Sequence, residues 1–211
     1  MTDGQAEASR LTDTAEPWPV LSSARHFHGR VIDVRTDQVL MPDGNTAERE
    51  VVEHPGAAAI VALDERDQVL MIRQYRHPVG WLLWELPAGL CDKPGEPAAV
   101  TAERELLEET GYRASDWRVL ADYFSSPGIS DERVRVFLAR GLFEVPHAER
   151  DFVPEDEEAY LRLAWVPLDR AVALILSGDM HNGVTEVGIL SAYAARRDGF
   201  AGLRPVDAPE R

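Results

Sequence analysis

The sequence contains one cysteine, Cys91, one lysine, Lys93, and no long run of apolar residues. A single cysteine excludes an internal disulfide, which fits a reducing compartment, and its ordinary role would be that of a small buried thiol. A membrane helix needs about 18 consecutive apolar residues, which no stretch of the chain supplies. The opening residues lack the basic start and the apolar core of a signal peptide. We therefore expect a cytoplasmic protein with no membrane partner.

Basic residues are also scarce, since 22 lysines and arginines stand against 37 acidic residues and give a net charge of -15. Sequence-independent binding to nucleic acid or to an anionic membrane needs a basic surface, so the charge argues against both partners. An anionic substrate stays compatible with this charge only if metal ions bridge it to the protein. The 211 residues, 45% hydrophobic and 28% charged, are ordinary for one soluble globular domain with a modest extra element.

The pattern of apolar residues predicts four parts. Residues 1–17 are polar and acidic, as expected of a flexible tail. Residues 18–54 alternate apolar and polar positions around the turn sequence MPDGNT, which predicts a small antiparallel sheet. Residues 55–200 form the main domain, where buried strands at 56–63 and 69–77 are expected to pair as a central hairpin, and residues 201–211 form a polar tail. Further strands are expected at residues 81–89, 117–124, 134–139 and 160–166, and helices at residues 96–111, 168–177 and 184–195.

The most informative segment is GLCDKPGEPAAVTAERELLEETGY at residues 89–112, because it places Glu105, Glu108 and Glu109 on one helical face. Like charges at this spacing cost roughly 0.2–0.5 kcal/mol per pair in a bare helix, so a cation is expected beside them. The only basic residue in the helix is Arg104 at the edge of that face, and a hard divalent ion with oxygen ligands is the natural partner. The acidic face should point away from the core. A merely solvated acidic face is the alternative.

The spacing of the glycines, glutamates and arginine in this segment resembles the Nudix box, the signature of hydrolases that act on a nucleoside diphosphate linked to another group. Two departures are visible. The loop at residues 90–95 is one residue longer than usual, and Tyr112 stands where an aliphatic residue is usual. The resemblance implies an α/β fold, a Nudix-type α/β/α sandwich with a mixed sheet, with the N-terminal β subdomain added to it.

Three further motifs, WELPAGL at residues 84–90, RQYRH at 73–77 and SSPGISDE at 125–132, are similar to the ADP-ribose pyrophosphatase branch of that family. This resemblance implies a homodimer in which residues 18–54 are exchanged between subunits. It also implies Mg²⁺-dependent hydrolysis of ADP-ribose to AMP and ribose 5-phosphate, with Mn²⁺ as a substitute ion. The alternatives are another nucleoside diphosphate sugar such as GDP-mannose, a dinucleotide, or a ligand-sensing module that has lost hydrolysis.

Carried over to this sequence, the resemblance implies that Glu105 and Glu109 bind the metals together with the backbone carbonyl of Ala88. Glu108 would be a second ligand or a hydrogen-bonding neighbour. Arg104 would hold the carboxylates in place, and an ordinary ion pair along the helix is compatible with that role.

The same resemblance implies a general base outside the box, on the acidic loop VPEDEEAY at residues 153–160. Glu158 is the first choice and Glu157 the second, while a solvated acidic loop is the alternative. Arg76 is the candidate phosphate contact because a guanidinium presents a planar fork to oxyanions. Arg73, taken to lie on the same strand face, is a weaker candidate.

The remaining candidates for substrate binding come from the strand and loop motifs. Trp84 offers an aromatic face for stacking, although packing in the core would use it equally well. The loop at residues 125–132 offers a glycine that permits close backbone approach and three polar side chains, but ordinary turn formation explains the same residues nearly as well. These loop candidates are Gly128, Ser130, Asp131 and Glu132.

Overall fold

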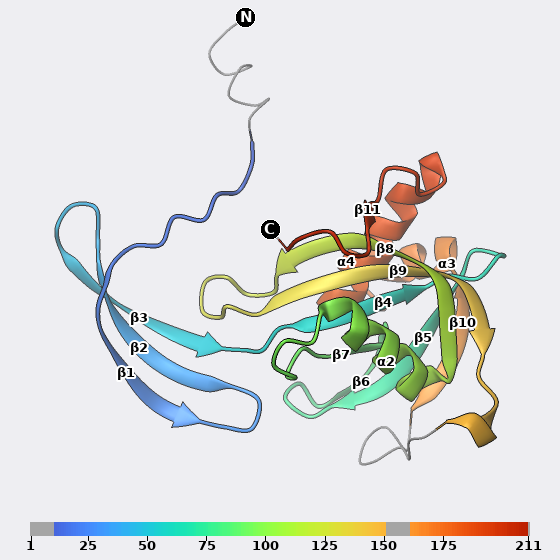
Figure 1. Cartoon of the computed structure of the whole chain (residues 1–211), viewed down its shortest axis with the longest axis horizontal. Helices are drawn as coiled ribbons and strands as arrows, with labels where there is room; N and C mark the ends of the chain where they lie inside the picture. The colour runs from blue at the N-terminus through green and yellow to red at the C-terminus, as the bar shows by residue number, and fades with distance from the viewer. Residues whose placement is uncertain (1–10, 151–160, 211) are drawn as a thin grey trace, which may run out of the picture. The chain divides into compact units, whose positions relative to one another are not determined.

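The structure is a computed structural model of the chain, and it describes residues 11–150 and 161–210. The chain divides into two compact units, Met1–Val51 and Val52–Arg211, each of which is described by itself. Figure 1 shows the elements of both units.

The first unit contains an antiparallel sheet in the order β1-β2-β3, with β1 at Val20–His28, β2 at Asp33–Leu40 and β3 at Thr46–Glu53. The predicted turn sequence connects β2 to β3, and Gly44 adopts a φ of 83° there, which a side chain would strain. Every residue of β1 is exposed. The predicted small N-terminal sheet is therefore present, and its first strand has both faces open.

The described residues of the second unit form two sheets. Its strands are β4 (Ala57–Ala62), β5 (Gln68–Arg76), β6 (Trp81–Glu85), β7 (Ala88–Leu90), β8 (Tyr112–Phe124), β9 (Arg133–Glu144), β10 (Arg162–Pro167) and β11 (Arg204–Pro205). The larger sheet has the order β11-β8-β9-β4-β7, in which β4 and β9 run parallel and the other neighbours antiparallel. The smaller, antiparallel sheet has the order β10-β5-β6.

The expected central hairpin of β4 and β5 is wrong. Both edges of β4 are taken, one by β9 and the other by β7, so β5 pairs instead with β6 and β10 in the second sheet. A single bridge between Leu63 and Val69 remains where the two strands meet at their turn. Two apolar strands joined by a short turn usually pair, but the buried position of β4 in the larger sheet overrides that local preference.

The α-helices among the described residues of this unit are α2 (Ala98–Thr110), α3 (Leu168–Leu176) and α4 (Gly183–Ala195). Because successive side chains of a strand point to opposite faces, β4 feeds two apolar clusters. Ala58 and Ile60 pack with Leu106 of α2, whereas Val61 packs with Ile189 of α4 on the other face. Helices therefore cover both faces of the mixed sheet (Figure 1), which confirms the predicted α/β/α sandwich.

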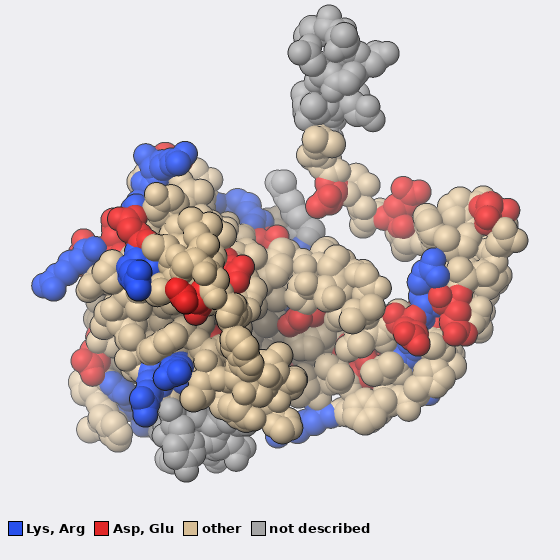
Figure 2. All heavy atoms as spheres, turned by 180° about the vertical axis from the view of Figure 1, so that it is seen from behind, with Lys and Arg blue, Asp and Glu red and all other residues tan. Residues whose placement is uncertain are grey.

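The described part of the expected polar tail, residues 201–210, continues along this sheet. Its short strand β11 pairs with β8 through Arg204 and Pro205, which lie opposite Val119 and Arg118. The face of the molecule in Figure 2 carries acidic and basic side chains interspersed over the described surface.

Candidate active site

Helix α2 carries Glu105 against the chain of β7 rather than into solvent. Glu105 is only 9% exposed. A Cβ built on Gly89 would lie 2.0 Å from both Cδ and Oε1 of Glu105, so the absence of a side chain at Gly89 makes room for this carboxylate. The acidic face is expected to point away from the core, but Glu105 is buried, because β7 lies against that face.

Arg104 holds the carboxylates of α2 together from one side. Its Nη1 donates to Oε1 of Glu105 at 2.6 Å and to Oε2 of Glu108 at 2.9 Å, and its Nη2 lies 3.7 Å from Oε1 of Glu96. Partial burial by itself would lower the pKa of the Arg104 guanidinium, but the charges of Glu105 and Glu108 raise it overall. Arg104 therefore stays a cation and fixes the orientation of two carboxylates.

Glu109 is held from the strand side. The backbone N–H of Ala88 donates to its Oε2 at 2.9 Å, and Ala88 is itself fixed opposite Ala59 in the pairing of β7 with β4. The helix also ends as predicted, since Gly111 adopts the left-handed conformation at φ 76° and donates to the carbonyl of Leu107. Glu105 and Glu109, one turn apart, thus both face β7.

A cleft of about 340 Å³ opens beside these groups. It brings together five of the predicted site residues: Arg76, Ala88, Arg104, Glu105 and Glu109. Gln74, Gly89, Leu90, Asp92 and Lys93 complete the lining. The cleft therefore joins the α2 carboxylates to cationic side chains from α2 itself, from β5 and from the loop between β7 and α2, which is the combination that a bridged anionic ligand requires.

Arg76 lines this cleft and forms an ion pair with the buried side chain of Glu85. Glu85 is only 3% exposed and accepts bonds from Nε and Nη2 of Arg76, the shortest of them 2.6 Å long. A buried carboxylate is normally retained only when it is paired in this way. Because Glu85 accepts hydrogen bonds from Nε and Nη2 of Arg76, it fixes the orientation of the guanidinium.

Arg73 does not share the strand face of Arg76, so that prediction is wrong. The two residues are three positions apart in β5, and side chains at odd spacing point to opposite faces. The guanidinium of Arg73 lies 5.8 Å from the ring centroid of Trp84, its partner across the strand pair. Trp84 in turn packs against the apolar cluster of β4 and α4, which is the packing alternative foreseen for it.

The predicted substrate loop, residues 125–132, lies before β9 and bonds to the chain that enters β4. Oδ1 of Asp131 accepts from the backbone N–H of His54 at 2.8 Å, and a carboxylate oxygen of Glu132 bonds to the hydroxyl of Ser125. The carbonyl of Val52 accepts from the backbone N–H of Asp131. These contacts match the turn-forming alternative, and their roles toward a substrate stay predictions.

Two other members of that loop behave similarly. The hydroxyl of Ser130 accepts from the backbone N–H of Glu132 at 3.1 Å. A Cβ built on Gly128 would meet no atom within 4 Å, so the chain itself places no demand for glycine there. None of the four loop candidates lines the cleft that the described residues form. The candidate bases Glu157 and Glu158 lie outside the described residues.

Sequence reasoning missed Glu85 as part of the site. The signal was present, because Glu85 is the one charged residue in the otherwise apolar stretch WLLWEL at residues 81–86. A charge in such a stretch predicts a buried ion pair, and the opposite strand holds a suitable cation in Arg76.

The groups at the cleft fit a hard divalent cation. Within residues 11–150 and 161–210, no three histidine, cysteine, aspartate or glutamate side chains form a ready cluster for a metal ion. Mg²⁺ does not require one, since it prefers one or two carboxylates together with waters and substrate phosphates. Glu105 and Glu109, held one turn apart against the glycine-containing strand β7, supply such a donor set.

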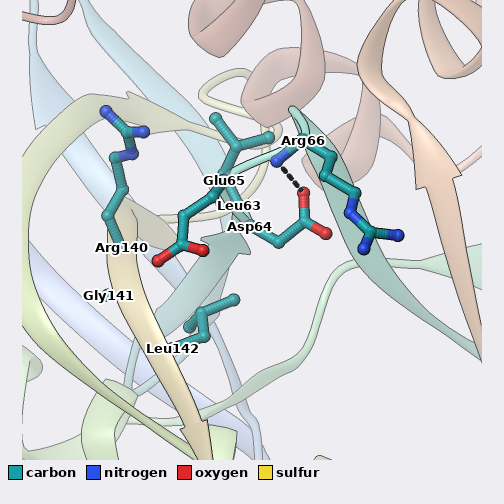
Figure 3. Close-up of a pocket in the computed structure, with 7 residues that line it drawn as sticks. All are labelled: Leu63, Asp64, Glu65, Arg66, Arg140, Gly141 and Leu142. Carbon is teal, nitrogen blue, oxygen red and sulfur yellow. Dashed lines mark hydrogen bonds between the residues drawn. The ribbon is translucent and has the colours of Figure 1, made fainter.

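A second cavity, of about 260 Å³, lies at the turn between β4 and β5 and beside β9. Figure 3 shows that its two guanidinium groups, from Arg66 and Arg140, extend to opposite sides of the lining residues. Asp64 is engaged with the backbone N–H of Arg66 at 2.8 Å. The cationic groups do not converge, so this cavity lacks the arrangement seen at the first cleft.

The model of the NUDIX domain matches residues 52–185 of this chain. The chain belongs to the Nudix family. Residues 18–52 match a second model, the nucleoside diphosphate sugar hydrolase N-terminal domain. Both matches confirm the resemblance found in the sequence, and they divide the chain close to the boundary between its two units. Nudix hydrolases generally need a divalent metal ion, as the donor set at the cleft suggests.

Similar proteins extend the family assignment to nearly the whole chain. The "ADP-ribose pyrophosphatase" of Mycobacterium tuberculosis is 47% identical over 187 residues, which cover 89% of this chain and 88% of that protein. The "ADP-ribose pyrophosphatase" of Bacillus subtilis is 37% identical over 77% of this chain and 85% of its own. A solved structure titled "Crystal structure of ADP compounds hydrolase" has a TM-score of 0.71 at 22% identity, covers 89% of this chain and 99% of its own, and shares the fold.

None of the helices within the described residues has the length and apolar character that a membrane crossing requires.

Proposed function

We propose that this Nudix protein hydrolyses the diphosphate of ADP-ribose, so that ADP-ribose and water give AMP and ribose 5-phosphate. The observation that carries the proposal is the convergence of Glu105, Glu109, Ala88 and Arg76 on one cleft. The length and identity of the match to the mycobacterial ADP-ribose pyrophosphatase favour this substrate among nucleoside diphosphate compounds.

In the proposed site, some residues bind the metal ion and others keep those ligands in position. Glu105 and Glu109 would hold Mg²⁺, or Mn²⁺ in its place, with the carbonyl of Ala88 as a further ligand. The ion, when bound, supplies charge neutralisation for phosphoryl oxygens and activation of water. Glu108, which shares Arg104 with Glu105, is the second ligand or the hydrogen-bonding neighbour. Arg104 keeps the carboxylates in position.

The substrate would be bound from the opposite side of the cleft. Arg76, oriented by Glu85, donates to a phosphate oxygen with the part of its guanidinium that faces the cleft. Glu158, with Glu157 as the second choice, would take the proton of the attacking water as general base. Residues of the loop at 125–132 would contact parts of the substrate that extend beyond the cleft, because none of the four candidates there lines it. Arg73 and Trp84 are the weaker candidates for substrate contact.

Assembly as a homodimer is part of the proposal. The N-terminal sheet exposes several large apolar side chains, and a three-stranded sheet of this kind gains stability by packing against another surface. The exposed large apolar residues among the described residues of that unit are Leu11, Trp18, Val20, Leu21, Phe27 and Val31. Light scattering on the purified protein should give the mass of two chains. The single cysteine is consistent with action in the cytoplasm.

The test is product analysis with purified protein, Mg²⁺ and a panel of ADP-ribose, GDP-mannose and a dinucleotide. Release of AMP from ADP-ribose at a rate well above the other cleavages supports the proposal, and equal or faster cleavage of GDP-mannose overturns the choice of substrate. Glu105→Gln should abolish most of the turnover. Glu103→Gln is the matched control, because Glu103 is an exposed glutamate on the same helix that does not line the cleft. A protein that binds these compounds but cleaves none would be a sensing module.

A further inference from the structure

The segment of residues 204–210 is fastened to the sheet that supports α2. Arg204 pairs with Val119 in β8, and its Nη1 donates to Oδ2 of Asp122 at 2.8 Å. Further along, the carbonyl of Pro205 accepts from the backbone N–H of Ala208 at 3.0 Å, which closes a turn. The segment is thus fixed in a defined path over the sheet.

Arg135 is the centre of this attachment. It is 6% exposed, and its Nε and Nη2 donate to the two oxygens of Asp122 at 2.7 and 2.9 Å. Its Nη1 donates to the carbonyl of Ala208 at 2.8 Å, and its Nη2 also to that of Pro209 at 3.2 Å. A buried guanidinium that donates to two backbone carbonyls fixes the position of that chain segment, because its donors have a fixed planar geometry. A lysine ammonium has no such geometry.

The same segment packs on the beginning of α2. Val206 and Ala208 contact the apolar cluster that contains Ala102 and Leu106 of that helix. Residues 97–99 face residues 206–208 across a space of about 300 Å³. Helix α2 begins after Pro97 with no side-chain cap and no acidic residue in its first turn. Its first turn therefore depends on packing contacts for its position, and this segment supplies some of them.

We propose that residues 204–210 are a positioning strap, locked by Arg135, which sets the placement of α2 and thereby of Glu105 against β7. The proposal rests on the function proposed above for the α2 carboxylates. Glu105 lies about 10 Å along the helix from Ala98, at a rise of 1.5 Å per residue. Its carboxylate lies so close to Gly89 that the space between them would not hold a side-chain Cβ. A small tilt of the helix would therefore separate the carboxylates from the position at which they share a cation.

The test replaces residues 204–210 by a glycine and serine sequence of equal length and measures Mn²⁺ binding by electron paramagnetic resonance, with kcat and KM for ADP-ribose. We expect Mn²⁺ affinity to fall about 10-fold, as for the loss of groups that orient metal ligands, with kcat falling more than KM rises. Addition of the free peptide RPVDAPE at millimolar concentration should restore part of both. Arg204→Ala, which removes one bond to Asp122 from a part-exposed side chain, should show the same change to a smaller degree.

Ile189→Val is the stability control, because Ile189 is buried in the cluster on the other face of the sheet. All proteins are compared below their melting transitions, as checked by circular dichroism. Mn²⁺ affinity and kcat that stay at wild-type values in both strap variants would overturn the strap, as would an equal loss in Ile189→Val. If the unaltered protein neither binds Mn²⁺ nor cleaves ADP-ribose, the proposed function fails instead.

Discussion

Gly89→Ala tests whether the close approach of β7 to Glu105 sets the geometry of the site. The new Cβ would lie 2.0 Å from Cδ of Glu105, whereas ordinary contacts begin at 3.4 Å, so the carboxyl group has to retreat by about 1.4 Å. Displacements of about 1 Å in a reacting constellation cost up to about 10²-fold in rate. We expect kcat with ADP-ribose at saturating Mg²⁺ to fall about 10- to 100-fold, which corresponds to about 1.4–2.7 kcal/mol.

The fold should survive this substitution. Gly89 has no left-handed φ, and the atoms that the Cβ meets belong to the end of a flexible side chain. The melting temperature should therefore change little. Gly183→Ala is the matched control, since its Cβ meets no atom within 4 Å, its φ is also not left-handed, and it does not line the cleft. A Gly89→Ala enzyme with the kcat of Gly183→Ala would refute the reasoning.

Four further predictions follow from the same geometry. Glu85→Gln should lower kcat/KM for ADP-ribose about 10-fold or more, because Arg76 loses its charged partner; unchanged steady-state constants would contradict this. Glu158→Gln should depress kcat about 10²–10⁴-fold with little change in substrate affinity, and a near-native rate in stopped assays would exclude it as the base. Mg²⁺ should raise the melting temperature of the wild type and not of Glu105→Gln, as scanning calorimetry can check. Burial alone would raise the pKa of Asp122, but bonds from Arg135 and Arg204 hold it below the ordinary 3.8. The stability that this carboxylate contributes is complete above pH 3.8 and is lost as pH falls through the lower pKa of Asp122 in the folded protein. Asp122→Asn should therefore have a lower melting temperature than the wild type at neutral pH. The difference between the two melting temperatures should narrow below about pH 4.

The sequence predicted the glutamate helix well because two independent signals agreed on it. Apolar spacing placed Leu106 toward the core, and the left-handed Gly111 marked the end of the helix. The strand pattern also located most strands of the sandwich. The single strand expected at residues 81–89 is wrong, because the structure has two strands there, β6 and β7, which belong to different sheets, and β11 was not predicted. Local periodicity is a strong signal when one face of an element is buried and the other is not.

Strand partners were less accessible to sequence reasoning. The apolar runs of β4 and β5 predicted two buried strands but not their assignment to different sheets, because pairing depends on which neighbours occupy each edge. The same limit applies to the strand faces of Arg73 and Arg76, where correct counting along β5 would have separated them. The sequence predicts a polar tail after Leu203. The structure instead holds this segment through the backbone carbonyls of Ala208 and Pro209, and contacts of backbone atoms cannot be predicted from the pattern of residue types.

The charges around α2 connect the candidate site to its supports. Arg104 donates hydrogen bonds to the carboxylates of Glu105 and Glu108. The backbone N–H of Ala88, which carries no charge, donates to the carboxylate of Glu109. Across the cleft, the charge of Arg76 is already matched by Glu85. The carboxylates of α2 would repel an anionic diphosphate that approached them directly. A divalent cation between substrate and helix, which Nudix hydrolases generally need, would remove that repulsion.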